Sequence, residues 1–414
     1  MPVRRESMLV VERYSTLVER EAALASLARY VSEAAAGQGR LVLVPGEAGV
    51  GKSALVEQLR RDNADVQWWW GACDGLFTPR PLGPLFDIAD QMGGDLRELC
   101  LTGAAREQLF GALLRRLNDQ TTLQVVVVED IHWADEATLD LLRFLARRID
   151  AMRVLLVVTY RDDGVKPADP LRVALGELAI QRATRRIDVA PLSVDGVRVL
   201  AGPTAVDVAT IFRLTGGNPF YVTEVLRAGI AEVPQSARDA VLARAARLTG
   251  EAREALDAAA LIGTRIEPPI LESVTACSSL VIDELLRSGL LVDDAGWLGF
   301  RHEIARRAVE QAVGPHRRTA VHARILDALL QASYGDDARL AFHAEGAANA
   351  SAVLLHAPRA ARRAAELASH REAAAQYERA LRFASGMEPA DAAALYDALA
   401  AELSLNDGWH GAAD

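Results

Sequence analysis

Short apolar runs alternate with helix-like patterns through the first half of the chain. The runs are RLVLVPG, VQWWWGACDG, LQVVVVEDIHWAD and MRVLLVVTYRDD. Between them, stretches such as SALVEQLRRD and REQLFGALLRRLND space their apolar residues three or four positions apart, which is typical of one helix face. The four valines Val125–Val128 favour a parallel strand that is covered on both faces. Strands alternating with helices predict a doubly wound α/β domain with a parallel sheet, over residues 15–195.

The strand pattern fades after residue 195, and we expect mainly helices from there on. Residues 196–236 predict a helical lid, and residues 1–14 a short N-terminal extension. Residues 237–312 predict a winged-helix domain, because helices are followed by two apolar runs that flank the turn DDAG. The fold class expected is therefore an α/β P-loop domain followed by helical modules.

The last segment, residues 313–414, is amphipathic and rich in alanine. It resembles tetratricopeptide (TPR) repeats, with side chains at helix-packing intervals, namely Ala374, Tyr377, Ala380 and Phe383. Because the chain stops within a second unit, we expect a helical region that is truncated in mid-repeat.

Composition narrows the class of protein. No apolar run in the 414 residues approaches the roughly 20 that a membrane helix needs, and the N-terminus lacks a secretory pattern. The scattered Cys73, Cys100 and Cys277 fit reduced thiols in a cytoplasmic protein. A net charge of −10 argues against wholesale nucleic-acid binding.

The clearest chemical signal is a phosphate-binding loop after the first strand. The segment satisfies G-x-x-x-x-G-K-[ST] between a strand and a helix, which is the context the motif requires. Backbone N–H groups would face the phosphates of ATP or ADP, and Ser53 would ligate Mg²⁺. Lys52 is one of only two lysines in a chain whose basic residues are otherwise arginines. The predicted nucleotide-binding residues here are Gly46, Glu47, Ala48, Gly49, Val50, Gly51, Lys52, Ser53 and Ala54.

Acidic and basic residues follow the later strands, where ligands of such sheets bind. Glu129 and Asp130 would divide two roles, holding Mg²⁺ and orienting water. Spacing assigns the metal to Glu129, although the more usual order puts aspartate first, so the division stays open. Arg161 is placed to reach a γ-phosphate, or else is a surface arginine paired with Asp162 or Asp163. His132 is expected near the nucleotide, and the tryptophans of VQWWWGACDG are expected mainly in the core.

The order of several motifs carries a family resemblance. LVEREAALASL, the P-loop, EDIHWADEATLDLL, TYRDD, LTGGNPFYVTEVL and FRHEIARRAV occur in sequence. Together they resemble the signal-transduction ATPases with numerous domains (STAND), and especially the large ATP-binding regulators of the LuxR type, over about residues 15–312.

The resemblance implies further contacts to the nucleotide. Arg20 matches a family Gly-Arg motif beside the base and ribose, with Glu19 standing where glycine is usual. Arg161 matches the sensor arginine, and Pro219 the lid proline that packs on adenine. His302 resembles the winged-helix histidine that reaches the β-phosphate of ADP, or else it is an ordinary, partly buried histidine.

The resemblance also bears on partners. Family members normally carry a DNA-reading domain at the C-terminus, but no Lys or Arg follows Arg382, so we expect no DNA-binding domain within this chain. The helical repeats would bind an unknown inducer or protein partner.

Three functions stay open at this stage. The favoured one is an ATP/ADP-binding regulatory switch in transcription, with weak Mg²⁺-dependent ATP hydrolysis and nucleotide-dependent self-association. The alternative is an AAA/initiator-like ATPase with steady turnover, for which Arg147 and Arg148 are candidate fingers. The third is a scaffold whose nucleotide is structural.

Overall fold

The computed structural model covers the whole chain apart from its ends and several short internal segments. The residues described are 17–405, except 74, 76–79, 119–121, 163–168, 204–206, 229–236, 295 and 333–335. The predicted N-terminal extension, the last eight residues of the predicted lid and the final turn after residue 405 therefore lie outside the described residues.

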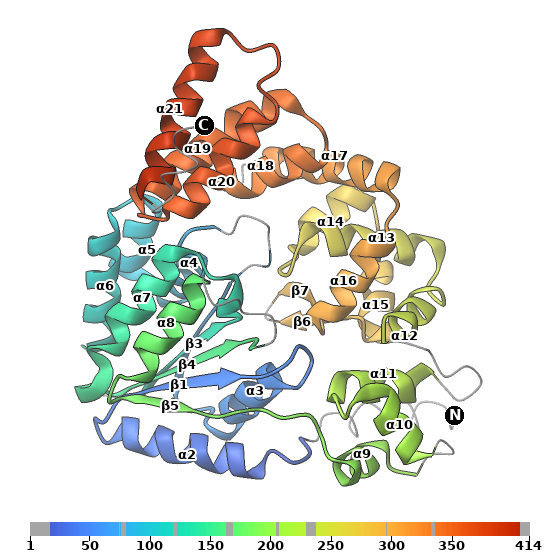
Figure 1. Cartoon of the computed structure of the whole chain (residues 1–414). Helices are drawn as coiled ribbons and strands as arrows, with labels where there is room; N and C mark the ends of the chain where they lie inside the picture. The colour runs from blue at the N-terminus through green and yellow to red at the C-terminus, as the bar shows by residue number, and fades with distance from the viewer. Residues whose placement is uncertain are drawn as a thin grey trace.

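A five-stranded parallel sheet forms the first domain, as the sequence predicts (Figure 1). Its order is β2-β3-β4-β1-β5, so the P-loop strand β1 lies between β4 and β5. The strands are β1 Arg40–Pro45, β2 Gln67–Ala72, β3 Gln124–Glu129, β4 Val154–Tyr160 and β5 Thr184–Arg186. The four predicted strands are confirmed. The sequence reading missed β5, which consists of three polar residues and has no apolar pattern to detect.

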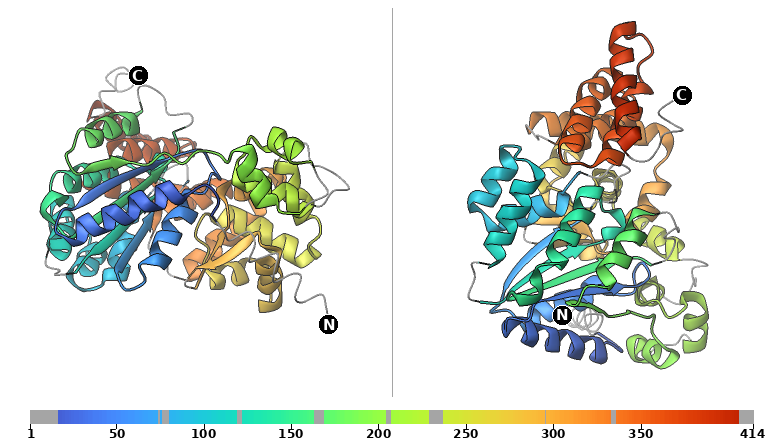
Figure 2. Two further views of the ribbon diagram at one scale, coloured as in Figure 1. Left: turned by 90° about the horizontal axis from the view of Figure 1, so that it is seen from below. Right: turned by 60° about the vertical axis from the view of Figure 1, so that its left-hand side comes forward.

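Helices cover both faces of the sheet (Figure 2). Val125 and Val127 of β3 join a core with the helices of one face, and Val126 and Val128 join the core of the other. The first face carries α2 Glu21–Ala35 and α3 Lys52–Asp62. The second carries α4 Gly83–Met92, α5 Gly94–Leu101, α6 Arg106–Asn118, α7 Glu136–Ala146 and α8 Pro170–Ala179. Two short 3₁₀ helices, η1 Ile131–Trp133 and η2 Ile149–Ala151, follow β3 and α7.

The chain then leaves the sheet and builds two smaller units. The first, the three-helix unit, has its own small core and comprises α9 Val194–Ala201, α10 Val208–Thr215 and α11 Pro219–Ala228. The second, the hairpin region, comprises α12 Ala237–Ala245, α13 Gly250–Ile262, α14 Pro268–Thr275, α15 Ser279–Ser288, β6 Leu291–Asp294, β7 Trp297–Phe300 and α16 Glu303–Ala312. Strands β6 and β7 are antiparallel and pair Leu291 with Phe300, so the predicted hairpin is present.

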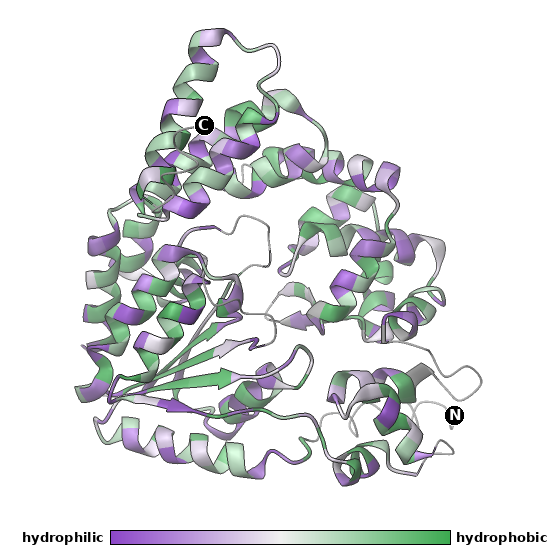
Figure 3. Cartoon of the chain, viewed as in Figure 1, coloured by the Kyte–Doolittle hydropathy of each residue, from purple (hydrophilic) through white to green (hydrophobic). Residues whose placement is uncertain are grey.

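Five helices complete the described chain as a helical array. They are α17 Pro315–Gln331, α18 Asp337–Gly346, α19 Ala350–Glu366, α20 His370–Leu381 and α21 Pro389–Leu405. Apolar and polar residues share these helices, in contrast to the mostly apolar strands of the sheet (Figure 3). Ala374, Tyr377 and Ala380 of the predicted packing positions are buried, and Phe383 packs partly buried against the same core as Ala380. That core also holds the hairpin region, so these two parts of the chain pack as one body.

Candidate nucleotide site

The P-loop joins β1 to α3 and is shaped by glycines. Gly49 has φ +77°, a region that side chains disfavour. A Cβ at this position would also lie only 2.8 Å from the Phe220 Cβ atom and 3.1 Å from the Asn218 side-chain oxygen. Gly49 is therefore required both by its backbone conformation and by the close approach of α11.

Lys52 lies at the start of α3 with a buried side chain. Its Nζ donates to the carbonyl oxygens of Gly46, at 2.7 Å, and Glu47, at 2.9 Å. The ammonium therefore lies inside the loop, where a phosphate would compete with these two carbonyls for it. This is the position that the motif predicts for the lysine.

The paired acids lie at the end of β3. Trp70 Nε1 donates to Glu129 Oε2 at 3.0 Å, whereas the buried Oε1 has no hydrogen-bond partner among the described residues. Burial raises the pKa of Glu129 to about 7, and Ser53 opposes this rise. Asp130 adopts a left-handed conformation with φ +56°, and its N–H donates to the Thr159 hydroxyl at 3.0 Å.

These acids fit a Mg²⁺ ion held largely by a nucleotide. The free oxygen of Glu129 and the nearby Ser53 hydroxyl are hard oxygen ligands of the kind that Mg²⁺ prefers. Among the described residues no group of three His, Cys, Asp or Glu side chains is arranged to hold a metal. The remaining ligands would therefore be phosphate oxygens and water.

Three cations surround His132, which follows the acids. Burial, together with the positive charges of Arg161, Lys52 and Arg307, lowers the pKa of His132 to about 3. The His132 side chain is 10% exposed, and neither ring nitrogen has a hydrogen-bond partner among the described residues. This neutral imidazole thus lies among three positive charges and near the Asp130 carboxylate, whose Oδ1 atom is 3.6 Å from His132 Nδ1.

The two arginines of this cluster reach it from different domains. Arg161 follows β4. Its side chain has no hydrogen bond or ion pair within the described part of the chain, so the alternative pairing with Asp162 is not formed. The predicted alternative partner, Asp163, lies outside the described residues. Arg307 comes from α16 of the hairpin region, and its guanidinium carbon is 4.8 Å from the centroid of the Trp133 ring.

Arg20 is buried and contacts main-chain groups. Its guanidinium donates to the carbonyl oxygens of Val50, at 3.1 Å, and Ala190, at 2.7 Å. It thereby ties the P-loop to the segment that leads into α9. Glu19 has φ +57°, which explains why glycine suits this position, and its carboxylate accepts from the Ser193 N–H at 2.8 Å.

The three-helix unit and the hairpin region both approach the P-loop. The Asn218 side-chain N–H donates to the Ala48 carbonyl oxygen at 2.8 Å, and the Phe220 N–H donates to the Gly49 carbonyl at 3.3 Å. The Phe220 ring centroid lies 4.4 Å from that of His302. Pro219 stands between the two P-loop contacts and begins α11. The predicted lid and winged-helix residues thus lie within one or two contacts of the loop.

Comparison with known proteins agrees with this geometry. Residues 16–158 match the family model of the AAA ATPase domain. This segment is an AAA ATPase domain. Over 408 aligned residues, the chain is 28% identical to an uncharacterized protein of Rhizobium meliloti strain 1021, covering 80% of this chain and 39% of that protein.

One solved structure is similar in fold, and a second matches more weakly. A STAND protein with a tetratricopeptide repeat sensor from Pyrococcus horikoshii matches with a TM-score of 0.58 and 17% identity, over 93% of this chain and 62% of that chain. The Orc1 protein of Aeropyrum pernix in complex with DNA matches with a TM-score of 0.42 and 18% identity, over 72% and 94% of the two chains. The similarity to the STAND structure shows the fold alone, and the TM-score of the Orc1 match is too low to support an argument. The present chain spans well under half of its curated relative and under two thirds of the STAND structure.

Sequence reasoning missed two residues that complete the surroundings of the AAA ATPase site. Phe220 and Arg307 come from α11 and α16, far along the chain, and only tertiary packing brings them to the P-loop and to Trp133. An apolar residue and a helical arginine carry no motif of their own. Among the described residues, no helix has the length and apolarity to cross a membrane.

Proposed function

We propose that this chain is an ATP/ADP-binding regulatory switch that hydrolyses ATP slowly and self-associates in a nucleotide-dependent way. The observation that carries the proposal is the convergence of three parts of the chain on one loop. Asn218 and Phe220 hydrogen-bond to the P-loop carbonyls, and His302 packs on Phe220. A ligand bound in this loop would be in contact with the elements that a switch has to move.

The proposed nucleotide contacts follow the motif. The loop from Gly46 to Gly51 would surround the phosphates, Lys52 would leave the carbonyls of Gly46 and Glu47 for them, and Ala54 would continue the helix N-terminus. Ser53 and Glu129 would hold Mg²⁺, which supplies charge neutralisation at the phosphates. Arg20, Pro219 and His302 would contact the nucleotide as the STAND resemblance implies.

Charge gives the switch a physical basis. Lys52, Arg161 and Arg307 all bring positive charge to His132, and Arg307 belongs to the hairpin region. A γ-phosphate near them would attract all three, whereas ADP would leave Arg161 and Arg307 to repel each other. Only a ligand that interacts differently with two states can shift their populations. The third phosphate would therefore change how firmly the hairpin region is held.

The paired acids at the end of β3 are the basis for proposing slow hydrolysis. Glu129 has one oxygen engaged by Trp70, and Asp130 follows it where water would be oriented. The order of these acids is the reverse of the usual one, which favours slow turnover.

The wider role is proposed from the family resemblance. The hairpin region would be a winged-helix module, and the helical array would be a TPR-like sensor for an inducer or protein partner. The whole would belong to a cytoplasmic transcriptional regulator of the LuxR type, with DNA reading outside this chain.

The experiment measures bound nucleotide and its release. We expect ADP to co-purify with the chain, with turnover far below the roughly 1–10³ s⁻¹ of typical enzymes. In His302→Ala, release of a fluorescent ADP analogue should accelerate about tenfold and light scattering should detect more oligomer. His316→Ala, an exposed histidine on α17, is the matched control.

Two results would contradict the proposal. Steady turnover within the typical range would favour the initiator-like ATPase. Equal ADP release from the wild type, His302→Ala and His316→Ala would remove the role of the hairpin region in retaining nucleotide.

A further inference from the structure

The three consecutive tryptophans of β2 divide between two environments. β2 is an edge strand, and it places Trp69 beside Val126 and against the core of the second face. Trp68 and Trp70 align with Val125 and Val127 and pack, partly buried, on the face that carries α3. All three indoles are partly buried, so each packs against a core, as expected, and each also keeps some exposed surface.

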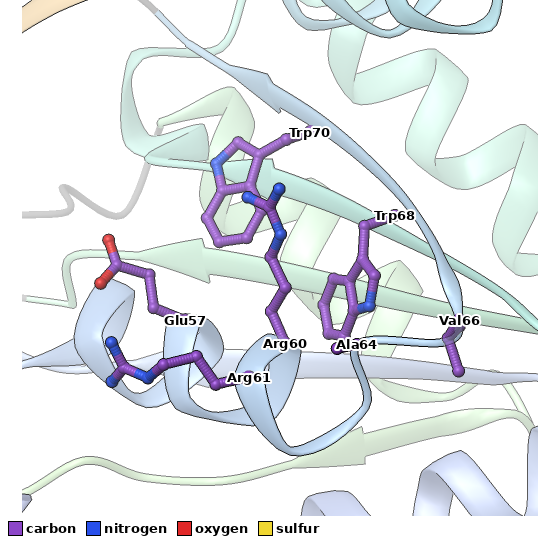
Figure 4. A pocket seen from close by; sticks show the side chains of 7 residues that line it. All are labelled: Glu57, Arg60, Arg61, Ala64, Val66, Trp68 and Trp70. Carbon is purple, nitrogen blue, oxygen red and sulfur yellow. The ribbon is translucent and has the colours of Figure 1, made fainter. Parts of the chain in front are cut away.

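Trp68 and Trp70 line a pocket of about 550 Å³ together with residues of α3 and the loop after it (Figure 4). This volume falls within the roughly 300–1,000 Å³ of small-molecule sites. Figure 4 shows Arg60 rising from α3 toward the indoles. Glu57 and Arg61 also line the pocket.

The polar groups of the two indoles are already used by the protein. Trp68 Nε1 donates to the Asn63 carbonyl oxygen at 3.1 Å, and Trp70 Nε1 donates to Glu129 Oε2 at 3.0 Å. What the tryptophans can still offer a ligand is therefore the face of each ring. Aromatic faces attract planar rings through stacking and through apolar burial.

Arg60 supplies the charge. The residue is exposed, and its side chain has no hydrogen bond or ion pair to another described residue, whereas the neighbouring Arg61 donates to Gln58 Oε1 at 2.8 Å. Arginine prefers carboxylate, sulfonate or phosphate groups, which accept from its planar set of donors.

We propose that the Trp68–Trp70–Arg60 pocket binds a small planar aromatic anion, with the ring against the indoles and the charge on Arg60. The site is separate from the P-loop but adjoins it, because Trp70 is also the hydrogen-bond donor to Glu129. A ligand stacked on Trp70 would restrain the indole that holds this carboxylate. The pocket is thus an effector site for the ATPase domain, and its ligand binding does not depend on the proposed switch.

The test uses naphthalene-2-sulfonate as the probe and the full chain with its tryptophan indoles labelled with ¹⁵N. The titration is run with and without saturating ADP, so that binding at the P-loop is separated from binding at this pocket. Trp68→Phe and Trp70→Phe assign the two indole N–H signals. We expect both signals to shift saturably with the probe, while those of Trp133 and Trp297 stay in place.

Variants then examine the charge and the ring separately. Arg60→Ala should weaken probe binding about tenfold, or about 1.4 kcal/mol, because the charged partner of the probe anion is removed. Arg182→Ala, whose side chain is 91% exposed on another part of the domain, should leave binding unchanged. Trp70→Phe keeps a ring face and should retain binding, because the lost N–H points to Glu129.

Four results would overturn the proposal. They are equal binding of the neutral naphthalene-2-methanol, unchanged affinity in Arg60→Ala, shifts spread over all tryptophans, and shifts that follow protein concentration instead of probe. The last would indicate that a second copy of the chain covers this face.

Discussion

Two of the interfaces between the ATPase domain and the rest of the chain differ in chemistry. At the P-loop, Asn218 and Phe220 donate to neutral main-chain carbonyls, and the Phe220 ring is 2% exposed. At the start of α7, the Ser369 hydroxyl of the helical array donates to the buried Asp135 carboxylate at 3.1 Å and accepts from the Ala137 N–H at 3.3 Å. Leu367, also of the array, is 1% exposed and joins the core of the ATPase domain.

This difference indicates which interface can respond to which signal. The first is made on the loop that would hold the phosphates, so its strength should depend on the nucleotide. The second is built on a buried carboxylate that also accepts from Leu82 and Thr138, so its strength should depend on protonation. The P-loop interface ends on the loop that follows β1, only a few residues from Lys52. The array interface ends on the segment that follows β3, only a few residues from Glu129.

The largest expected effect comes from Phe220→Ala at the P-loop interface. Truncating a buried phenylalanine typically costs about 3–5 kcal/mol. Because this ring joins the P-loop to His302, we expect the hairpin region to detach and ADP release to accelerate at least about tenfold. Stopped-flow release of a fluorescent ADP analogue and small-angle scattering measure the two effects.

Phe110→Ala is the matched control, because Phe110 is equally a buried phenylalanine but lies in the core of the ATPase domain. Phe110→Ala should lower the melting temperature. Its rate of ADP release should change no more than this loss of stability explains. If both variants release ADP alike, the P-loop interface has no special relation to the nucleotide.

A smaller effect is expected from Ser369→Ala at the array interface. The change leaves the buried Ala137 N–H without its acceptor and removes a donor from Asp135, which costs about 1–2 kcal/mol. We expect a melting temperature lower by a few degrees, and ADP release within twofold of the wild type. The exposed Ser32→Ala should show neither change. A large increase in ADP release would mean that the two interfaces are not separable.

The parts of this structure that sequence predicted are those fixed by local pattern. Val125–Val128 had to be a strand buried on both faces, and the P-loop motif sets the position of Lys52 through its glycines and the helix that follows. Arg20 was assigned from resemblance to the ribose side, and in the structure its guanidinium contacts the carbonyls of Val50 and Ala190.

The parts that sequence did not predict depend on long-range packing. Arg307 looks like any helical arginine until α16 brings it to Trp133, and Ser369 looks like an ordinary cap until it meets Asp135. Strand β5 was missed because pairing with β1, and not its own TRR sequence, makes it a strand.

The last prediction concerns pH, and it belongs to the array interface. Burial, together with the negative charges of Asp135 and Glu136, raises the pKa of Glu372 to about 8, against an ordinary value of 4.5, while Arg371 opposes the rise. Burial raises the pKa of Asp135 as well. The folded state therefore binds a proton at Glu372 that the unfolded state releases between these two pH values. Stability should fall as pH rises from about 4.5 to 8.

Glu372→Gln tests this dependence because glutamine cannot ionise. At about pH 4 its melting temperature should be close to that of the wild type, and the variant should become the more stable of the two as pH rises from about 4.5 to 8, with a constant difference above that range. Glu378→Gln, an exposed position on the same helix, should follow the wild type at every pH. If the advantage of Glu372→Gln does not grow as pH rises from about 4.5 to 8, Glu372 is ionised in the folded chain over this range. The array interface would then keep the contacts of Ser369 and Leu367 but have no sensitivity to protonation at Glu372.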